Sequence, residues 1–224
     1  MVIAIDGPGG VGKSTISRAV AEQLGIDHLD TGATYRAATL AVMAAGIDLV
    51  DTDAVVGVID DAAIKYEAGR LLLNGQDVTA AARSSEVNDR VSAVSAIAQI
   101  RERIVDMQRD WVQDRGGTAV VEGRDIGTVV FPQARVKVFM TAHADVRAAR
   151  RSQDAEAADI GVAQVKADLD RRDQIDSTRA ASPLKPAEDA VVVDTSDMGV
   201  EEVVALVLDL VGAQRRSGRR PGPA

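Results

Sequence analysis

The sequence predicts an α/β fold in which helices flank a central parallel sheet of five strands. Short apolar runs alternate along the chain with helical patterns, and the runs end in glycine or polar residues before the next helical pattern begins. Strands that are separated by helices form parallel sheets. The ligands of open parallel sheets bind at the carboxyl ends of the strands, so we expect the functional residues to follow directly after the apolar runs.

The five predicted strands are residues 2–6, 26–30, 118–122, 135–140 and 190–194. Helical patterns are clearest in residues 13–24, 33–45 and 200–211. In the first helix, Ile16, Val20 and Leu24 recur at the spacing of one helical face. Gly46 ends the second helix, because glycine is common just past a helix. The third carries acidic residues in its first turn, where they suit the helix dipole.

The segment from residue 63 to residue 80 departs from this alternation. It contains three short β-prone runs, which are separated by Ala68-Gly69 and Asn74-Gly75. Because Asn-Gly between such runs is a strong hairpin signal, the segment predicts a small antiparallel insert. A long helix follows, whose apolar face includes Trp111. We expect this tryptophan to lie in the core rather than to contact a ligand.

The composition of the 224 residues excludes several classes of protein. Hydrophobic residues make up 46% and charged residues 27%, as in an ordinary globular domain. The absence of cysteine excludes a disulfide scaffold, a thiolate zinc site and a thiol nucleophile. The two histidines, His28 and His143, lie far apart, which argues against a poly-histidine metal site or a Ser-His-Asp hydrolase. We expect both histidines to be structural or exposed.

Charge and hydropathy indicate where the protein acts. Lys and Arg number 26 and Asp and Glu number 34, which gives a net charge of −8 and argues against binding to nucleic acid or to an anionic membrane. The longest apolar stretch, residues 203–211, contains Asp209 and falls short of the roughly 20 residues of a membrane span. The first apolar run is too short for a secretory signal. We therefore expect a cytoplasmic protein with no nucleic-acid or membrane partner.

Residues 7–14 carry the most specific motif of the chain. They read Gly-Pro-Gly-Gly-Val-Gly-Lys-Ser, a full match to the phosphate-binding pattern G-x-x-x-x-G-K-[ST], and they lie between a predicted strand and a predicted helix. Glycines let backbone N–H groups converge on phosphate oxygens, and the helix N-terminus adds positive potential. Lys13 would reach the β- and γ-phosphates, and the Ser14 hydroxyl would ligate Mg²⁺. The motif predicts a nucleoside triphosphate and Mg²⁺ as ligands.

Other residues narrow the class to a small phosphotransferase. The guanine-reading motif Asn-Lys-x-Asp of GTPases is missing, since neither Asn74 nor Asn88 is followed by lysine. Motor and helicase ATPases are usually larger. Phosphoryl transfer requires cations around two phosphate groups, and several arginines lie near predicted strand ends or on the helices that follow: Arg36, Arg124, Arg147, Arg150, Arg151, Arg172 and Arg179.

Four segments resemble the bacterial cytidylate kinase family of nucleoside monophosphate kinases. They are residues 5–8 (Ile-Asp-Gly-Pro) with the phosphate loop, residues 29–36 (Leu-Asp-Thr-Gly-Ala-Thr-Tyr-Arg), residues 122–132 (Glu-Gly-Arg-Asp-Ile-Gly-Thr-Val-Val-Phe-Pro), and residues 172–179 with Ser182-Pro183-Leu184. The segment at residues 122–132 is highly specific to that family. The resemblance as a whole covers residues 2–212. It implies transfer of the γ-phosphate of ATP to CMP, with dCMP as a second substrate, to give ADP and CDP.

The resemblance also implies roles for single residues. The ATP site would comprise Gly7, Pro8, Gly9, Gly10, Val11, Gly12, Lys13, Ser14, Thr15, Arg147 and Arg151. The CMP phosphate would bind Thr31, Arg36 and Arg124; cytosine would be read by Ser92, Arg101 and Asp125; ribose would bind Arg172, Asp176 and Arg179. Lys13, Arg124, Arg172 and Arg179 would act in the transfer. Thr34 and the Ala- and Asp-rich segment around residues 153–161 depart from the family pattern, so the lid contacts to ATP are left open.

These features predict one P-loop kinase domain over residues 1–214, which we expect to be a monomer. Its core comprises residues 1–50, 106–149 and 173–214, with a monophosphate-binding insert at 51–105 and a short lid at 150–172; residues 215–224 form a basic disordered tail. Two alternatives stay open. A kinase of the same fold would act on UMP or another small acceptor, and a nucleotide-switch module would hydrolyse ATP slowly without needing arginines around a second phosphate.

Overall fold

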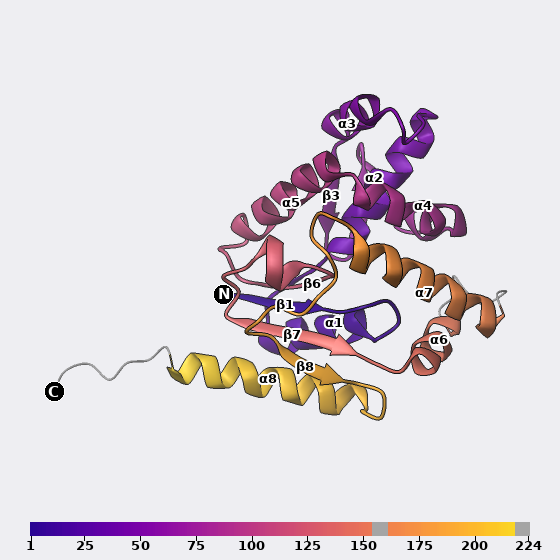
Figure 1. Ribbon diagram of the computed structural model, residues 1–224. Coiled ribbons are helices and arrows are strands. Elements are labelled where there is room, and N and C mark those ends of the chain that lie inside the picture. Colours follow the sequence, from indigo (N-terminus) through magenta and orange to yellow (C-terminus); the bar gives the residue numbers. More distant parts are fainter. Residues whose placement is uncertain (154–160, 218–224) are drawn as a thin grey trace.

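The computed structural model describes residues 1–153 and 161–217, and its centre is a sheet of five parallel strands (Figure 1). The strand order is β2-β6-β1-β7-β8. The strands are β1 (Val2–Asp6), β2 (Asp27–Asp30), β6 (Ala119–Gly123), β7 (Val136–Thr141) and β8 (Val191–Asp194). The five predicted strands are therefore confirmed, and their ends differ from the prediction by at most one residue.

Eight helices surround the sheet in the described residues. They are α1 (Lys13–Leu24), α2 (Thr31–Ala45), α3 (Thr52–Asp61), α4 (Ser85–Ala96), α5 (Ala98–Gln113), α6 (Ala144–Ser152), α7 (Val162–Thr178) and α8 (Val200–Ser217). A 3-10 turn, η1 (Ala81–Arg83), and a π-turn, η2 (Ile126–Val130), complete the helical elements. Helix α2 begins two residues earlier than predicted, because the Asp30 carboxylate accepts a hydrogen bond from the backbone of Ala33 at 3.1 Å and caps the helix.

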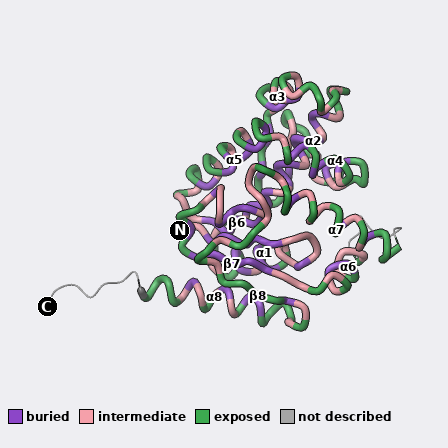
Figure 2. The backbone as a smooth tube through the Cα atoms, in the orientation of Figure 1, coloured by how far each residue is buried: buried purple, intermediate pink, exposed green. Residues whose placement is uncertain are grey.

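Two hydrophobic layers enclose the sheet, and the alternation of side chains along β1 assigns each residue to one of them. Ile3 and Ile5 pack with α1 and α8 on one face, whereas Ala4 packs with α2 and α5 on the other. Valine, isoleucine, leucine and alanine fill most of both layers. In Figure 2 the buried positions lie along the strands and on the inward sides of these helices. The sheet is thus a fixed base for the loops at its carboxyl edge.

The predicted antiparallel insert is confirmed as a second sheet of three strands. Its strands β3 (Ile64–Glu67), β4 (Arg70–Leu73) and β5 (Gln76–Asp77) pair in chain order. Both turns carry two residues with positive φ, Ala68-Gly69 and Asn74-Gly75, as tight hairpin turns require.

Trp111 of α5 anchors that sheet to the parallel core, as its predicted core position implied. Its indole N–H donates to the backbone oxygen of Tyr66 in β3 at 2.6 Å. The two rings meet edge to face at 6.3 Å, and the guanidinium of Arg115 covers the indole at 3.8 Å. The tryptophan therefore ties the insert to α5 and contacts no part of the cavity described below.

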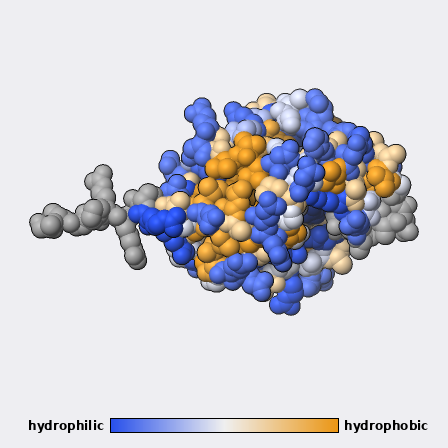
Figure 3. All heavy atoms as spheres, turned by 90° about the horizontal axis from the view of Figure 1, so that it is seen from below, coloured by the Kyte–Doolittle hydropathy of each residue, from blue (hydrophilic) through white to orange (hydrophobic). Residues whose placement is uncertain are grey.

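Helix α8 corrects the predicted start of the C-terminal tail. It continues to Ser217, so residues 215–217 are helical and not part of a disordered segment. Arg215 and Arg216 in its last turn interact favourably with the negative end of the helix dipole. The rest of the predicted tail, residues 218–224, lies outside the described residues. Figure 3 shows hydrophobic residues gathered on the face that carries α8, with hydrophilic residues around them.

Helices α5 and α7 extend across two predicted boundaries. The expected ends of the insert at residue 105 and of the lid at residue 172 both fall inside continuous helices. In Figure 1, α6 and α7 lie beyond the carboxyl ends of the strands. Most of the unmatched lid segment, residues 154–160, lies outside the described residues. No helix in residues 1–153 or 161–217 combines the length and the apolar character needed to cross a membrane.

Candidate active site

A cavity of about 860 Å³ lies at the carboxyl edge of the parallel sheet, between the phosphate loop, the insert and α7. On its donor side the walls come from residues 10–15 of the loop, with Arg150 and Arg151 of α6. On the other side the lining includes Thr31, Arg36, Ser92, Arg101, Arg124, Asp125, Arg172, Asp176 and Arg179. All nine residues that the sequence assigns to the acceptor nucleotide therefore surround one cavity, although they come from distant parts of the chain.

The phosphate loop turns sharply between β1 and α1, and two of its glycines are sterically required. Gly7 has a φ of 148°, and a Cβ atom there would lie 2.2 Å from the backbone oxygen of Met140. Gly10 has a φ of 77°, and a Cβ atom there would lie 2.7 Å from the backbone oxygen of Arg147. Because both close approaches involve backbone atoms, no side chain fits without moving the loop.

Lys13 lies inside this loop with its ammonium folded back on it. Its Nζ donates to the backbone oxygen of Pro8 at 2.7 Å. Burial, together with the positive charge of Arg124, lowers the pKa of Lys13 to about 7. A bound polyphosphate would supply the missing negative charge and raise that pKa again. Lys13 is therefore placed and tuned to respond to an anion in the loop.

The Ser14 hydroxyl belongs to a chain of three polar side chains below the loop. It donates to Oε2 of Glu122 at 2.9 Å, and the other oxygen of Glu122 lies 3.0 Å from Nε2 of His28. Glu122 is 2% exposed, and a polar side chain buried so deeply needs hydrogen-bond partners such as these. His28, which the sequence suggested to be structural or exposed, holds this carboxylate in place.

The donor set around Ser14 fits Mg²⁺. In residues 1–153 and 161–217, no group of three or more His, Asp and Glu side chains could hold a metal ion alone. Mg²⁺ prefers oxygen ligands and usually takes only one or two protein groups beside substrate phosphates and water. The Ser14 hydroxyl, with the buried Glu122 carboxylate beside it, matches this coordination preference.

Asp30 organises the cationic wall next to this chain. One of its oxygens lies 3.9 Å from the guanidinium of Arg36 and 3.9 Å from that of Arg83 in η1. Although burial acts to raise the pKa of Asp30, the charges of Arg36, His28 and Arg83 together keep it below its ordinary value. Asp30 thus holds two arginines at the cavity wall, and Arg83 is one that the sequence analysis did not single out.

Arg124 links the acceptor wall to the phosphate loop. Its Nε donates to Asp176 at 2.8 Å, and its Nη1 donates to the backbone oxygen of Gly7 at 2.8 Å. Next to it, Arg172 is half-buried. Desolvation, together with the charges of Arg124 and Arg36, lowers its pKa to about 10. A phosphate group bound here would offset the repulsion between these guanidinium groups.

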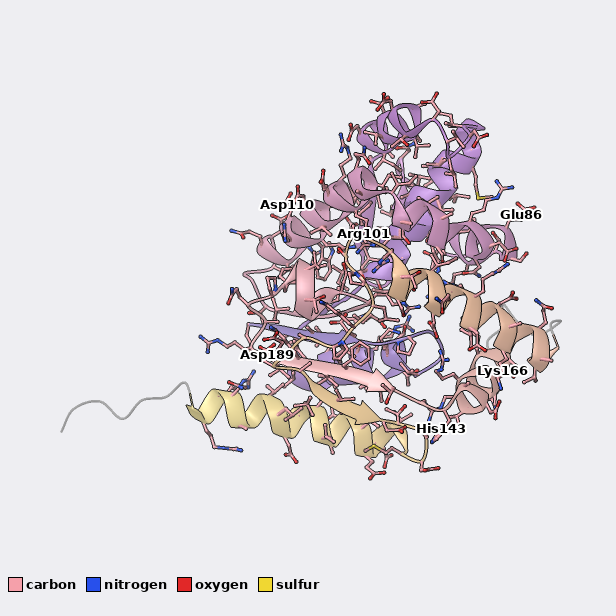
Figure 4. All side chains as sticks on the ribbon, in the orientation of Figure 1. Glu86, Arg101, Asp110, His143, Lys166 and Asp189 are labelled. Carbon is pink, nitrogen blue, oxygen red and sulfur yellow. The ribbon has the colours of Figure 1, made fainter. Side chains whose placement is uncertain are left out.

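Asp125 and Arg101 form a buried ion pair at the far end of the cavity. Nη2 of Arg101 donates to Oδ2 of Asp125, and its Nη1 donates to the backbone oxygen of Ser95 at 3.1 Å. The guanidinium lies over the ring of Tyr35, 5.2 Å from its centre. Arg101 points inward from α5, while Asp110 on the same helix points to solvent (Figure 4). Arg179 lies 3.9 Å from Asp125, and its Nη2 lacks a hydrogen-bond partner.

The arginines of α6 have different positions. Arg147 donates to the backbone oxygen of Gly9 at 3.2 Å and pairs with Asp173 of α7. Arg150 donates to the backbone oxygen of Thr195 at 2.6 Å. These two hold the loop and its neighbours together, and Arg147 does not line the cavity. Arg151 does line it; the ATP contacts of both Arg147 and Arg151 stay predictions.

Comparisons with known proteins agree with this geometry. Residues 3–213 match the family model described as cytidylate kinase. The cytidylate kinase of Mycobacterium leprae is 49% identical over 220 residues, covering 97% of this chain and 97% of its own. The cytidylate kinase of Shouchella clausii is 46% identical over 220 residues, covering 96% of this chain and 97% of its own.

The fold also matches solved structures of low sequence identity. TT1252 from Thermus thermophilus superposes with a TM-score of 0.51 at 18% identity, covering 96% of this chain and 97% of its own. An uncharacterized protein from Eubacterium ventriosum gives a TM-score of 0.53 at 12% identity, covering 95% of this chain and 98% of its own. At these identities the likeness concerns the fold alone.

Proposed function

The chain belongs to the cytidylate kinase family, and we propose that it transfers the γ-phosphoryl group of ATP to CMP, and also to dCMP, with ADP and the diphosphate as products. The observation that carries this proposal is the cluster of cations beside the phosphate loop. Arg36, Arg124, Arg172 and Arg179 line the same cavity as Lys13. A protein that only bound or hydrolysed ATP would need no such cluster around a second phosphate group.

The donor triphosphate binds along residues 7–15. Its β- and γ-phosphates accept hydrogen bonds from backbone N–H groups at the start of α1, where the helix dipole favours negative charge. Lys13 leaves the oxygen of Pro8 and neutralises charge that spreads over the transferring group. The Ser14 hydroxyl, held by Glu122, would bind Mg²⁺, and that ion when bound supplies further neutralisation of the β- and γ-phosphates.

The acceptor phosphate binds on the opposite wall of the cavity. Thr31 lies at the start of α2, where its hydroxyl donates to the backbone oxygen of Glu122 at 2.6 Å. To bind the acceptor phosphate, the hydroxyl leaves that oxygen and donates to a phosphate oxygen, beside the N–H groups of the helix N-terminus. Arg36 and Arg124 bind the acceptor phosphate oxygens. Arg172 and Arg179 neutralise the group in transfer, which involves little covalent chemistry and depends on positioning and charge.

Asp125, Arg101 and Ser92 select the base. Cytosine presents an amino donor at N4 beside acceptors at N3 and O2, so a matching pocket needs one acceptor and one or two donors. The Asp125 carboxylate is the acceptor, and Arg101 and Ser92 are the donors. Uracil reverses the first two groups, because its O4 would face the carboxylate and its N3–H would face the guanidinium.

Movement of two segments completes the site. The insert and the described part of the lid, the end of α6 and the start of α7, close on the two nucleotides and exclude water that would otherwise take the γ-phosphoryl group. Arg172 and Asp176 then hold the ribose. Small-angle scattering is expected to record a more compact particle when both nucleotides are bound. Profiles that do not change on binding would contradict this closure.

We propose that the enzyme acts as a monomer in the cytoplasm. Every residue assigned to the two nucleotides comes from one chain, and each lines one cavity, belongs to the phosphate loop or, in the case of Arg147, contacts that loop. A partner subunit is therefore not needed to complete the site. Size-exclusion chromatography with light scattering tests this, and a stable dimer would contradict it.

A coupled assay of ADP release tests the proposed reaction directly. We expect slow release with ATP alone, a large stimulation by CMP, a similar stimulation by dCMP and a much weaker one by UMP. Equal stimulation by CMP and UMP would indicate a kinase of different acceptor specificity. ATP turnover that no monophosphate changes would indicate a nucleotide-switch module and would contradict the proposal.

A further inference from the structure

Asp6 is a buried carboxylate beside the active-site cavity. The proposed mechanism gives it no role. It is the last residue of β1, opposite Gly123 of β6 and Phe139 of β7 in the sheet, and it is 5% exposed. Burial raises its pKa to about 6, against the effect of two backbone hydrogen bonds. Burying a carboxylate lowers the stability of the folded protein, so we expect a function that explains this residue.

Both oxygens of Asp6 accept hydrogen bonds from the turn that follows Arg124 and Asp125. Oδ1 accepts from the backbone N–H of Ile126 at 2.8 Å, and Oδ2 accepts from that of Gly127 at 2.7 Å. These are the first two residues of the π-turn η2, and Asp125 directly precedes them. The carboxylate therefore fixes the peptide groups immediately after Asp125.

The turn has little room to move in other directions. A Cβ atom on Gly127 would lie 3.1 Å from the side chain of Lys137, and one on Gly123 would lie 2.6 Å from both Thr31 and Ile126. The far end of the turn is held by Arg109 of α5, which donates to the backbone oxygens of residues 129 and 130 at 3.0 and 3.1 Å. Asp6 thus holds the end nearest the cavity.

The neighbours of Asp125 explain why its backbone must be held. Arg101 pairs directly with its carboxylate, and Arg179 lies 3.9 Å away. If the backbone were loose, the carboxylate would follow these two guanidinium groups. Its free lone pairs would then turn away from the acceptor nucleotide. A recognition group has to be held to within about half an ångström to act on its ligand.

We propose that Asp6 is a positioning residue for base recognition: its two hydrogen bonds hold the turn that aims the Asp125 carboxylate at the base of the acceptor nucleotide. This inference rests on the proposed function, since it requires Asp125 to read the base. Asp6 itself does not contact the acceptor. Its contribution appears as a preference between two bases that differ only at the positions Asp125 and Arg101 read.

The variant Asp6→Asn tests this, because asparagine keeps one acceptor oxygen and turns an N–H donor against a second backbone N–H. Steady-state kinetics with CMP and with UMP, at saturating ATP, give the ratio of their kcat/KM values. We expect this ratio to fall about tenfold, as the loss of a charge-assisted hydrogen bond implies, while the KM for ATP stays close to that of the unaltered enzyme.

Two further variants test whether the effect of Asp6→Asn comes from positioning of the turn, from the loss of a negative charge or from lower stability of the protein. Asp145→Asn removes the same charge at an exposed site of α6, where the carboxylate pairs only with Lys166 among the described residues, and it should leave both kinetic constants unchanged. Arg109→Ala releases the far end of the turn and should lower the ratio less than Asp6→Asn does. A purely structural role for Asp6 would lower activity toward CMP and UMP by the same factor.

The outcomes separate this inference from the proposed function. A folded Asp6→Asn enzyme with an unchanged CMP/UMP ratio would overturn the inference, whereas an unaltered enzyme with no preference for CMP would contradict the proposed function itself. If Asp6→Asn does not fold, an NMR measurement on the unaltered enzyme tests the inference instead. With CMP bound, NMR couplings across hydrogen bonds should connect the Asp6 carboxyl carbon with the amide nitrogens of Ile126 and Gly127, and their absence would overturn the inference.

Discussion

The phosphate loop on the donor side of the cavity is one continuous segment, residues 7–15, whereas the acceptor side is assembled from five separate parts of the chain. The donor loop derives its shape from local features, namely glycines with positive φ and the N-terminus of α1. The acceptor side takes residues from α2, α4, α5, the junction of β6 and η2, and α7. Its shape depends on ion pairs between these elements.

This difference predicts different consequences for function. A change in the donor loop alters a rigid segment that touches the transferring phosphoryl group, so it should affect the chemical step for every acceptor. A change on the acceptor side disturbs a network in which carboxylates and guanidinium groups orient one another, as Asp176 orients Arg124. Among the residues of this network that read the base, such a change should affect the choice of acceptor more than the chemistry.

The largest effect is expected from Lys13→Ala. Lys13 neutralises charge that develops in the transition state, and the loss of one such preorganised group costs about 10²-fold or more in kcat. The factor should be the same with CMP and with UMP, because Lys13 contacts the donor. Stopped assays of ADP release with each acceptor measure both constants.

Lys185→Ala is a matched control for that variant. Lys185 is an exposed lysine outside the cavity lining, so its loss should leave kcat unchanged. Circular dichroism should give the same spectrum for both variants and for the unaltered protein. A Lys13→Ala enzyme with near-normal kcat would contradict the assignment of the loop.

The next largest effect is expected from Asp125→Ala, and it should fall on selectivity. Each buried mismatch between base and pocket costs roughly 1–3 kcal/mol, so removing the acceptor group should lower the CMP/UMP ratio of kcat/KM by about 10- to 100-fold. The activity with UMP should change much less than the activity with CMP. Equal losses for the two acceptors would mean that Asp125 orients Arg124 instead of reading the base.

The same contrast explains what the sequence could predict. The five strands, the phosphate loop and the hairpin insert follow from local patterns, since apolar runs, glycine spacing and an Asn-Gly turn act within a few residues. Four acceptor arginines were singled out as cations near predicted strand ends, but the roles of all nine acceptor residues came only from the resemblance to a known family. Their convergence depends on packing between elements that lie far apart in the chain.

Residues that act through long-range contacts left no local signal. Asp6 looks like an ordinary strand end, and its partners are 120 and 121 residues away. Arg83 reaches Asp30 from a 3-10 turn of the insert. An acidic residue that ends a buried strand beside a phosphate loop is the one sequence feature that could have drawn attention to Asp6.

A smaller effect that sharpens the donor side is the pH dependence of ATP binding. The pKa of Lys13 is lowered to about 7 in the free protein and should rise when phosphates bind. Binding above pH 7 then takes up a proton, so ATP affinity should fall with rising pH, by at most about tenfold per pH unit. Calorimetry in buffers of different ionisation enthalpy measures the proton uptake. Lys13→Ala should abolish it, and uptake that persists in this variant would assign it to another group.

The smallest effect is expected from Trp111→Phe. This variant tests whether catalysis and base selection depend on how tightly the antiparallel insert is attached to α5. The change removes the hydrogen bond from the indole to the backbone oxygen of Tyr66, which should lower the free energy of unfolding by about 1 kcal/mol. Urea denaturation measures this loss. Because Trp111 lies outside the cavity lining, kcat and the CMP/UMP ratio should not change.

Arg115→Lys serves as the comparison, since it keeps the charge but removes the planar group that covers the indole, and it should destabilise less than Trp111→Phe. An unchanged CMP/UMP ratio in Trp111→Phe would mean that base selection depends on α4, α5 and the turn after β6, and not on how tightly β3 is attached. If the ratio falls, the insert sheet itself belongs to the acceptor side. In that case attachment of the insert would limit how well the carboxylate of Asp125 is aimed.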